Sequence, residues 1–382
     1  TRITLTAARH VDPRSPASSR GGSAQIAGPT KFDGGSIAAW LSKMKDMRIK
    51  CMHAVGYNAT AKILTDPTLT WTKTAYIGPQ MHPWDRFFYN ESLGNGTDAS
   101  GYTVDKWLGD LNTRYGGIDQ ALIWPTYTNI GIDDRNTFEL ILSMPGGAAG
   151  LKVVVDQLHA KGVKVLWPYH PWDSGTHGQE RNNETDFLAM AHLLQDTGSD
   201  GFNGDTMQHI PKAFVDASYS IGYKAIAMQA EGGLPEWDTP YRTIGWAEGW
   251  ISGAVYVDKP KWLSKGLATT QWSARWSGIG AGATALKGKL PQIQICWFNG
   301  LGYETWENVW GTWNGLIERS AEAIRRVGMM LRFFGHRAEN FFTSPDWIPF
   351  TAEGAQMEQG VFASAFPRGK ETVCWCCAGP GP

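Results

Sequence analysis

From about Thr72 onward, short apolar segments of strand length alternate along the chain with segments that have the periodicity of helices. Strands that alternate with helices at this spacing indicate a parallel sheet. Seven or eight such units in about 270 residues favour a closed (β/α)8 barrel of the TIM type, an α/β fold, over an open sheet. The expected strands cover residues 75–81, 120–127, 163–169, 199–203, 223–229, 271–276 and 292–298, and the expected helices cover 103–115, 146–161, 183–195, 212–219 and 313–334.

The regions on either side of this alternating segment differ from it in character. Residues 13–29 are rich in Ser, Pro, Gly and Arg, which is typical of a flexible leader. After Phe350, two alternating runs are separated by Arg368-Gly369-Lys370, which predicts a hairpin. The sequence thus predicts a flexible leader over 1–30, a helical N-terminal extension over 31–70, the barrel over 71–345 and the start of a small antiparallel β domain over 346–382.

The charge and motif content of the chain exclude several classes of partner. The formal net charge is -1, with 35 Lys and Arg against 36 Asp and Glu, so a broad basic surface for nucleic acid or an anionic membrane is not expected. No apolar run is long enough to span a bilayer, and no glycine-rich nucleotide-binding turn follows the first strand. The five Cys lack a matching His or Cys pair at metal-binding spacing. We therefore expect no nucleic acid partner, no membrane span, no cofactor and no metal.

Four Asn-X-Ser/Thr sequons bear on the compartment of the protein. They begin at Asn58, Asn90, Asn95 and Asn183, and three of them lie in polar, loop-like stretches. One sequon occurs easily by chance, but four in a chain of this length favour N-glycosylation at these asparagines. The sequence therefore predicts a secreted glycoprotein.

Two carboxylates close the fourth and fifth expected strands. Asp205 follows the strand at 199–203, and Glu231 follows the strand at 223–229. Catalytic groups of a barrel lie at the C-terminal ends of its strands, and two carboxyls on neighbouring strands can flank one glycosidic bond, as a retaining glycosidase requires. Glu231 follows an apolar strand, which suits the raised pKa of an acid, whereas Asp205 lies among Gly and Asn, which suits an ionised nucleophile. The alternative is that both carboxylates only cap loops.

Other residues near the expected strand ends are candidates for binding sugar. Aromatic rings stack on the C–H faces of sugars, and the chain has 19 Trp, although most single Trp side chains are expected to pack in the core. The candidate substrate-binding residues are Trp124, His170, Trp172, Asp173, Asn203, Asn299, Glu304 and Trp306. This set predicts a carbohydrate as the partner.

The segment Asp200–Ile210, Asp-Gly-Phe-Asn-Gly-Asp-Thr-Met-Gln-His-Ile, resembles the fourth-strand motif of the α-amylase superfamily, in which a Gly-Phe pair precedes an Asp nucleophile and a His often follows. The resemblance implies that Asp205 is the nucleophile. It also implies that Glu231, which ends the fifth strand, is the general acid/base. Lys164–His170 resembles the third-strand motif of the same superfamily.

The chain departs from that superfamily at two points. The Arg two residues before the nucleophile is Asn203 here, and the Asn-His-Asp run after the seventh strand is not matched, because Asn299 is followed by Gly300. The endo-α-N-acetylgalactosaminidase families keep the Asp and the Glu without the full amylase set, so the chain resembles a divergent relative of these retaining barrels. The α-galactosidase clan has its acid Asp on strand six, and the expected sixth strand, 271–276, contains none.

These observations predict a retaining glycoside hydrolase that acts on α-linked sugars of an oligosaccharide, a polysaccharide or a glycoprotein glycan. Two alternatives stay open. The missing Arg and third carboxylate suit a non-catalytic carbohydrate-binding or structural glycoprotein built on a decayed barrel. Alternatively, Glu304 or Glu307 follows the expected seventh strand, where another large clan of barrel glycosidases carries a Glu nucleophile. Glu307 could instead cap a helix that begins near Trp306.

Overall fold

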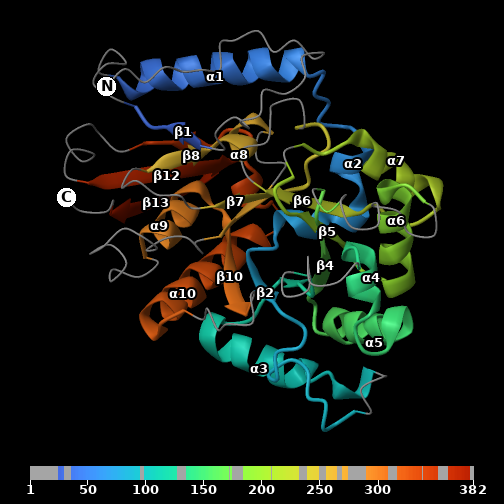
Figure 1. The fold of residues 1–382 in the computed structure, drawn as a ribbon. Coiled ribbons are helices and arrows are strands. Elements are labelled where there is room, and N and C mark those ends of the chain that lie inside the picture. The colour runs from blue at the N-terminus through green and yellow to red at the C-terminus, as the bar shows by residue number, and fades with distance from the viewer. Residues whose placement is uncertain are drawn as a thin grey trace.

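The computed structural model, drawn in Figure 1, describes residues 25–29, 36–94, 99–126, 135–171, 173, 184–207, 209–231, 239–248, 255–264, 269–273, 290–308, 316–337, 339–351 and 360–378. Within these ranges, no helix is both long and apolar enough to cross a membrane.

Eight parallel strands form a closed barrel, which confirms the predicted (β/α)8 fold. The strands are β2 (Ile77–Met81), β3 (Gln120–Ile123), β4 (Lys164–Tyr169), β5 (Gly201–Gly204), β6 (Ala227–Glu231), β7 (Ile244–Glu248), β9 (Thr269–Ser273) and β10 (Gly302–Asn308). Their order around the barrel follows the chain, and β10 closes the ring against β2. Because every neighbouring pair is parallel, the C-terminal ends of all eight strands meet at one end of the barrel.

Helices lie around the outside of the barrel, as Figure 1 shows. They are α3 (Val104–Tyr115), α4 (Thr137–Leu142), α5 (Gly147–Ala160), α6 (Asp186–Thr197), α7 (Lys212–Ser220), α8 (Lys259–Leu263), α9 (Leu290–Asn299) and α10 (Glu318–Gly335). The sequence places both ends of α3 correctly. This helix begins after Thr103 and ends where Gly116 takes a positive φ of 71°, a conformation that favours glycine.

Several elements differ from the sequence-based assignment. Residues 292–298, predicted to be a strand, lie inside helix α9, and the barrel strands β7 and β10 were not predicted. A short apolar run does not by its periodicity distinguish a buried helix from a buried strand. As a consequence, β9 is the seventh barrel strand rather than the sixth, and β10 is the eighth.

The N-terminal elements pack on one side of the barrel. They are β1 (Gln25–Ala27), α1 (Ile37–Ala54), α2 (Lys62–Thr65) and a 3-10 helix at Pro67–Lys73. β1 pairs antiparallel with β8 (Tyr256–Asp258), so these three residues of the predicted flexible leader belong to a two-stranded sheet. The indole of Trp262 in α8 donates to the carbonyl of Met44 in α1 at 3.1 Å, which fixes α1 against α8.

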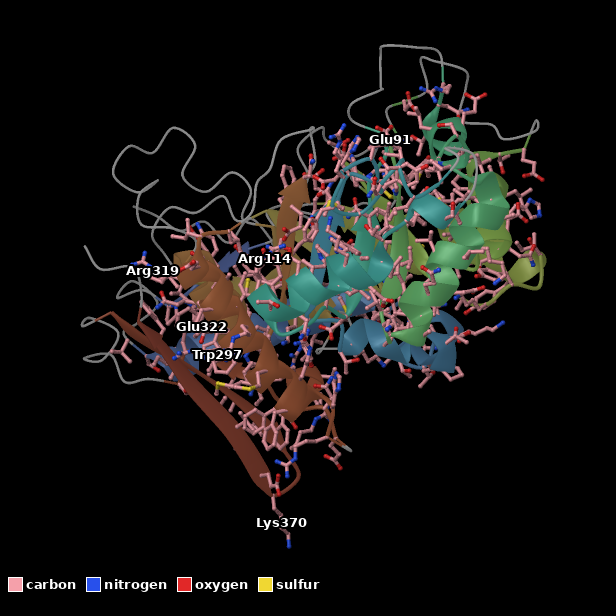
Figure 2. All side chains as sticks on the ribbon, turned by 90° about the horizontal axis from the view of Figure 1, so that it is seen from below. Glu91, Arg114, Trp297, Arg319, Glu322 and Lys370 are labelled. Atoms are coloured by element: carbon pink, nitrogen blue, oxygen red, sulfur yellow. The ribbon has the colours of Figure 1, made fainter. Side chains whose placement is uncertain are left out.

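A three-stranded antiparallel sheet follows the barrel, as predicted. It consists of β11 (Ile348–Pro349), β12 (Val361–Arg368) and β13 (Glu371–Ala378). β12 and β13 form the expected hairpin, in which Arg368 pairs with Glu371 and Gly369 takes a positive φ of 56° in the two-residue turn. Lys370 stands at the tip of this hairpin and points away from the rest of the molecule (Figure 2).

A buried lysine joins this sheet to the barrel helices. Lys261 of α8 is 1% exposed, and its ammonium donates to the backbone carbonyls of Asn299 and Gly300. Its Nζ also lies 5.1 Å from the ring centre of Trp347 and 5.0 Å from that of Phe366, a side chain of β12. Burial lowers the pKa of Lys261 to about 7, although Asp258 opposes this effect.

Candidate active site

The register of β5 and β6 decides which side chains point into the barrel. Alternate side chains of a strand point to opposite faces. Phe202 of β5 points outward, because its ring centre lies 4.7 Å from that of Phe214 in α7. Asn203 therefore points inward, where its Nδ2 donates to Oε1 of Gln229 on β6 at 3.0 Å, and both side chains are fully buried. Asp205 lies two residues beyond Asn203 on the same interior face.

Asp205 and Glu231 lie side by side at the C-terminal end of the barrel. Gly204 and Ala230 are register partners, so the two carboxylate residues follow at the next step of neighbouring strands. The N–H of Asp205 donates to the carbonyl of Tyr169 on β4 at 2.9 Å, which continues the strand ladder through this position. Asp205 is 2% exposed, whereas Glu231 is partly exposed. The structure thus brings together the two residues that the sequence predicts to be catalytic.

Thr206 links these two carboxylate positions through its backbone. Its N–H donates to Oε2 of Glu231 at 2.5 Å. Thr206 also has a positive φ of 52°, which is unusual for a β-branched residue and costs of order 1 kcal/mol. Strained backbone of this kind clusters at functional sites, and here the strain coincides with the N–H group that holds Glu231.

His170, at the end of β4, lies next to Asp205 and is fully buried. Its Nδ1 is 3.3 Å from Oδ2 of Asp205, and its Nε2 is 2.6 Å from Oγ1 of Thr126, which follows β3. The imidazole and the indole of Trp124 also form a T-shaped pair, with ring centres 5.1 Å apart. The second, third and fourth strands of the barrel, β3, β4 and β5, therefore contribute neighbouring polar groups at one end.

Glu307 points away from this site. On β10, its Oε1 accepts from the hydroxyl of Tyr115 at 2.8 Å, and its Oε2 accepts from Arg114 at 2.7 Å. Both partners belong to α3 on the outside of the barrel, where Figure 2 labels Arg114. Glu307 is fully buried within the strand and does not cap a helix. Its role is to anchor α3 to β10.

We therefore expect Glu307→Gln to weaken folding and to leave any glycosidase turnover unchanged. The neutral amide still meets the Tyr115 hydroxyl but removes one of the two carboxylates that pair with the half-buried Arg114, which keeps Asp110, at a cost of about 2 kcal/mol. Urea unfolding of the two proteins measures this difference. A large loss of kcat without a loss of stability would instead place Glu307 in the catalytic machinery.

Glu304, three residues earlier on β10, has the opposite orientation and points into the barrel, where it is 2% exposed. The indole of Trp306 donates to its Oε1 at 3.3 Å. Trp306 is 6% exposed, and Trp124 is fully buried with its ring centre 6.4 Å from that of Trp246 on β7. These indoles fill the barrel interior in the structure rather than stand as open platforms.

The remaining predicted substrate-binding residues do not join this cluster. Asp173 accepts from the N–H and the hydroxyl of Thr137, at 3.1 and 3.2 Å, and so holds the first turn of α4. Asn299, in the last turn of α9, accepts from the N–H of Asp258 and donates to the carbonyls of Tyr256 and Ile295. Trp172 lies outside the described residues.

One carboxylate residue at the C-terminal end of the barrel strands was not predicted from the sequence. β7 ends at Glu248, the register partner of Ser273, two residues beyond Trp246. The sixth barrel strand is therefore β7, which ends in a carboxylate residue, and not the segment 271–276 that the sequence predicted as the sixth strand. A signal was present in the sequence: β6 reads Ala-Met-Gln-Ala-Glu and β7 reads Ile-Gly-Trp-Ala-Glu, two pentads that both close in Ala-Glu.

The described residues contain no group of three or more His, Cys, Asp or Glu side chains that could hold a metal ion. Two of the predicted glycosylation sites are described. Asn58 is exposed, and Asn90 is half-buried. Asn95 and Asn183 lie outside the described residues, and glycosylation at all four stays a prediction.

Comparison with known proteins gives a likeness in structure and none in sequence. No family model and no curated protein matches the chain. The α-N-acetylgalactosaminidase NagBb of Bifidobacterium bifidum, as a quadruple mutant, superposes with a TM-score of 0.53 at 11% identity, over 88% of this chain and 61% of that enzyme. The chain has the same barrel fold as this enzyme. This confirms, at the level of fold, the resemblance that the strand motifs indicate.

A weaker likeness is to an α-amylase. The maltogenic α-amylase AmyB of Thermotoga neapolitana superposes with a TM-score of 0.49 at 12% identity, over 80% of this chain and 86% of that one. The chain thus spans less than two thirds of the length of NagBb.

Proposed function

We propose that the chain is a retaining glycoside hydrolase that acts on α-linked sugars of an oligosaccharide, a polysaccharide or a glycoprotein glycan. The observation that carries the proposal is the placement of Asp205 and Glu231 on consecutive strands, at the same register, at the C-terminal end of the barrel. Neighbouring strands lie about 4.8 Å apart, which suits the carboxyl separation of roughly 5 Å that double displacement needs.

In this mechanism Asp205 attacks the anomeric carbon while Glu231 donates a proton to the departing glycosidic oxygen. The first step leaves the sugar joined to the carboxyl of Asp205 as an ester. Glu231, now ionised, removes a proton from water, which attacks the same carbon and releases Asp205. The backbone N–H of Thr206 holds Glu231 beside the bond that is broken.

The first test is a screen with aryl α-glycosides of N-acetylgalactosamine, glucose and galactose, followed by proton NMR of the first sugar released. We expect turnover of at least one substrate with the α anomer formed first, because two inversions retain configuration. A β anomer formed first would contradict the retaining mechanism.

A second candidate function is carbohydrate binding without turnover. It is favoured by the near-complete burial of Asp205 and by the neutral Asn203–Gln229 pair at the place where the amylase motif has an Arg. This candidate predicts that the protein binds α-linked oligosaccharides in titration calorimetry and leaves them intact over long incubation.

A further inference from the structure

His170 is held on three sides at the end of β4. Thr126 contacts its Nε2 at 2.6 Å, the Trp124 indole packs roughly perpendicular to its ring, and Oδ2 of Asp205 lies 3.3 Å from its Nδ1. His170 and Thr126 are both fully buried. Nδ1 of an imidazole fixed in this way faces the carboxylate, although the two groups do not have hydrogen-bond geometry in this structure.

The hydrogen-bonding capacity of the partners determines where the proton of the imidazole lies. An ionised carboxylate only accepts, so the nitrogen that faces Asp205 must be the donor. The hydroxyl of Thr126 can donate, which lets Nε2 accept. A neutral imidazole with its proton on Nδ1 therefore matches both neighbours and places no extra charge in the barrel.

The other described polar groups near this pair have partners of their own. Beneath Asp205, the amides of Asn203 and Gln229 pair with each other and carry no charge. The backbone N–H of Asp173 donates to the carbonyl of His170. The carboxylate of Asp173 accepts a hydrogen bond from the N–H of Thr137 in α4. On the side of β6, Glu231 is held by the N–H of Thr206.

We propose that His170 is a positioning residue, which as a neutral imidazole donates its Nδ1 proton to Asp205 and holds that carboxylate ionised and in line for attack. The proposal rests on the proposed function, in which Asp205 is the nucleophile. At the present separation of 3.3 Å the bond is not formed, and in enzymes contacts of this kind are often poorly aligned until substrate binds. His170 thus supplies a hydrogen bond where the amylase motif supplies the charge of an Arg at position 203.

The test compares two variants of similar size, His170→Asn and His170→Leu. The Asn amide nitrogen falls near the place of Nδ1 and keeps a donor toward Asp205, whereas Leu removes it. The first readout needs no sugar: aspartate is labelled with ¹³C at the carboxyl carbon, and the Asp205 signal is assigned by its absence in Asp205→Asn. We expect the titration midpoint of Asp205 to rise by about one pH unit in the Leu variant and to return toward the wild-type value in the Asn variant.

The second readout is turnover of the aryl α-glycosides. We expect the Leu variant to lose about 100-fold in kcat with little change in KM, and the Asn variant to recover at least part of that loss. If the Leu variant does not fold, Thr126→Val replaces it, with a shift of the His170 proton from Nδ1 toward Nε2, seen by ¹⁵N NMR, as the expected result.

The outcomes separate the two proposals. An unchanged Asp205 midpoint in the Leu variant, or a rise of KM alone in both variants, would overturn the positioning role of His170. A shifted midpoint in a protein that cleaves none of the glycosides would overturn the proposed function and leave the contact between His170 and Asp205 intact.

Discussion

Asp205→Asn is expected to lower kcat on aryl α-glycosides by about 10⁴-fold or more, because an amide cannot form the ester intermediate and loss of a nucleophile removes most of the catalysis. The side chain keeps its size, and its carbonyl oxygen offers the same kind of acceptor toward His170. The fold should therefore survive, and unfolding in urea should show a midpoint close to that of the wild type.

Two further variants make this result specific. Asp156→Asn removes the same charge from an exposed position on α5, where Asp156 pairs with Lys152 at 2.8 Å, and should leave kcat unchanged. Glu304→Gln tests the other carboxylate that points into the barrel. If Asp205→Asn kept wild-type turnover while Glu304→Gln abolished it, the nucleophile would belong to β10 instead of β5.

Asp200→Asn is expected to cost about 3 kcal/mol of stability, because it breaks a buried charge cluster. Asp200 precedes β5, at the end of the barrel opposite Asp205, and is 2% exposed. Its carboxylate accepts from Nε2 of His159 at 2.6 Å and from Nζ of Lys224 at 2.8 Å. Lys164 adds a third contact at 3.2 Å, and the N–H of Val165 a fourth at 2.9 Å. An amide offers one acceptor oxygen and no charge to these four donors.

The same cluster predicts how stability depends on pH. Burial alone would raise the pKa of Asp200, but the hydrogen bond from His159, the charge of Lys224 and the N–H of Val165 outweigh it and hold the pKa well below its usual range. A depressed pKa in the folded state stabilises above the unfolded value of about 3.9 and loses that stabilisation as the pH falls through the folded value.

Urea midpoints of wild type and Asp200→Asn at pH 7, 5, 4 and 3 measure this contribution. The gap between the two proteins should be constant from pH 7 to 5 and should shrink below about pH 4. Parallel curves across the whole range would show that Asp200 does not carry the acid sensitivity.

The sequence predicts the local elements well wherever a strand or a helix has a distinct pattern and a clear end. Helix α3 is an example, with an amphipathic face and a glycine stop at Gly116. Helix α9 fails this condition because it is buried almost all round: Gln292, Ile293, Ile295 and Cys296 are each 5% exposed or less. A helix that packs against both the barrel and the C-terminal sheet has no polar stripe to reveal its period.

The candidate site is predicted in part. Asp205 and Glu231 could be found because each ends a strand, and parallel strands gather their C-terminal ends. The orientations of Glu304 and Glu307 could not be predicted, because they depend on which residues of β10 face the barrel interior. A shift of one residue exchanges the two faces of a strand. Two hydrogen-bond partners of Asn299, Tyr256 and Asp258, lie about 40 positions away along the chain. They belong to the short strand β8, which the sequence pattern does not predict.

The burial of Lys261 couples the unfolding of the C-terminal sheet to that of the barrel. Its ammonium is enclosed by rings from the C-terminal sheet on one side and by carbonyls at the end of α9 on the other. Removing the sheet would open this enclosure to water and strip the apolar cover from α9. The sheet therefore covers part of the hydrophobic core that α8 and α9 share with the barrel. We expect the sheet and the barrel to unfold in one cooperative transition.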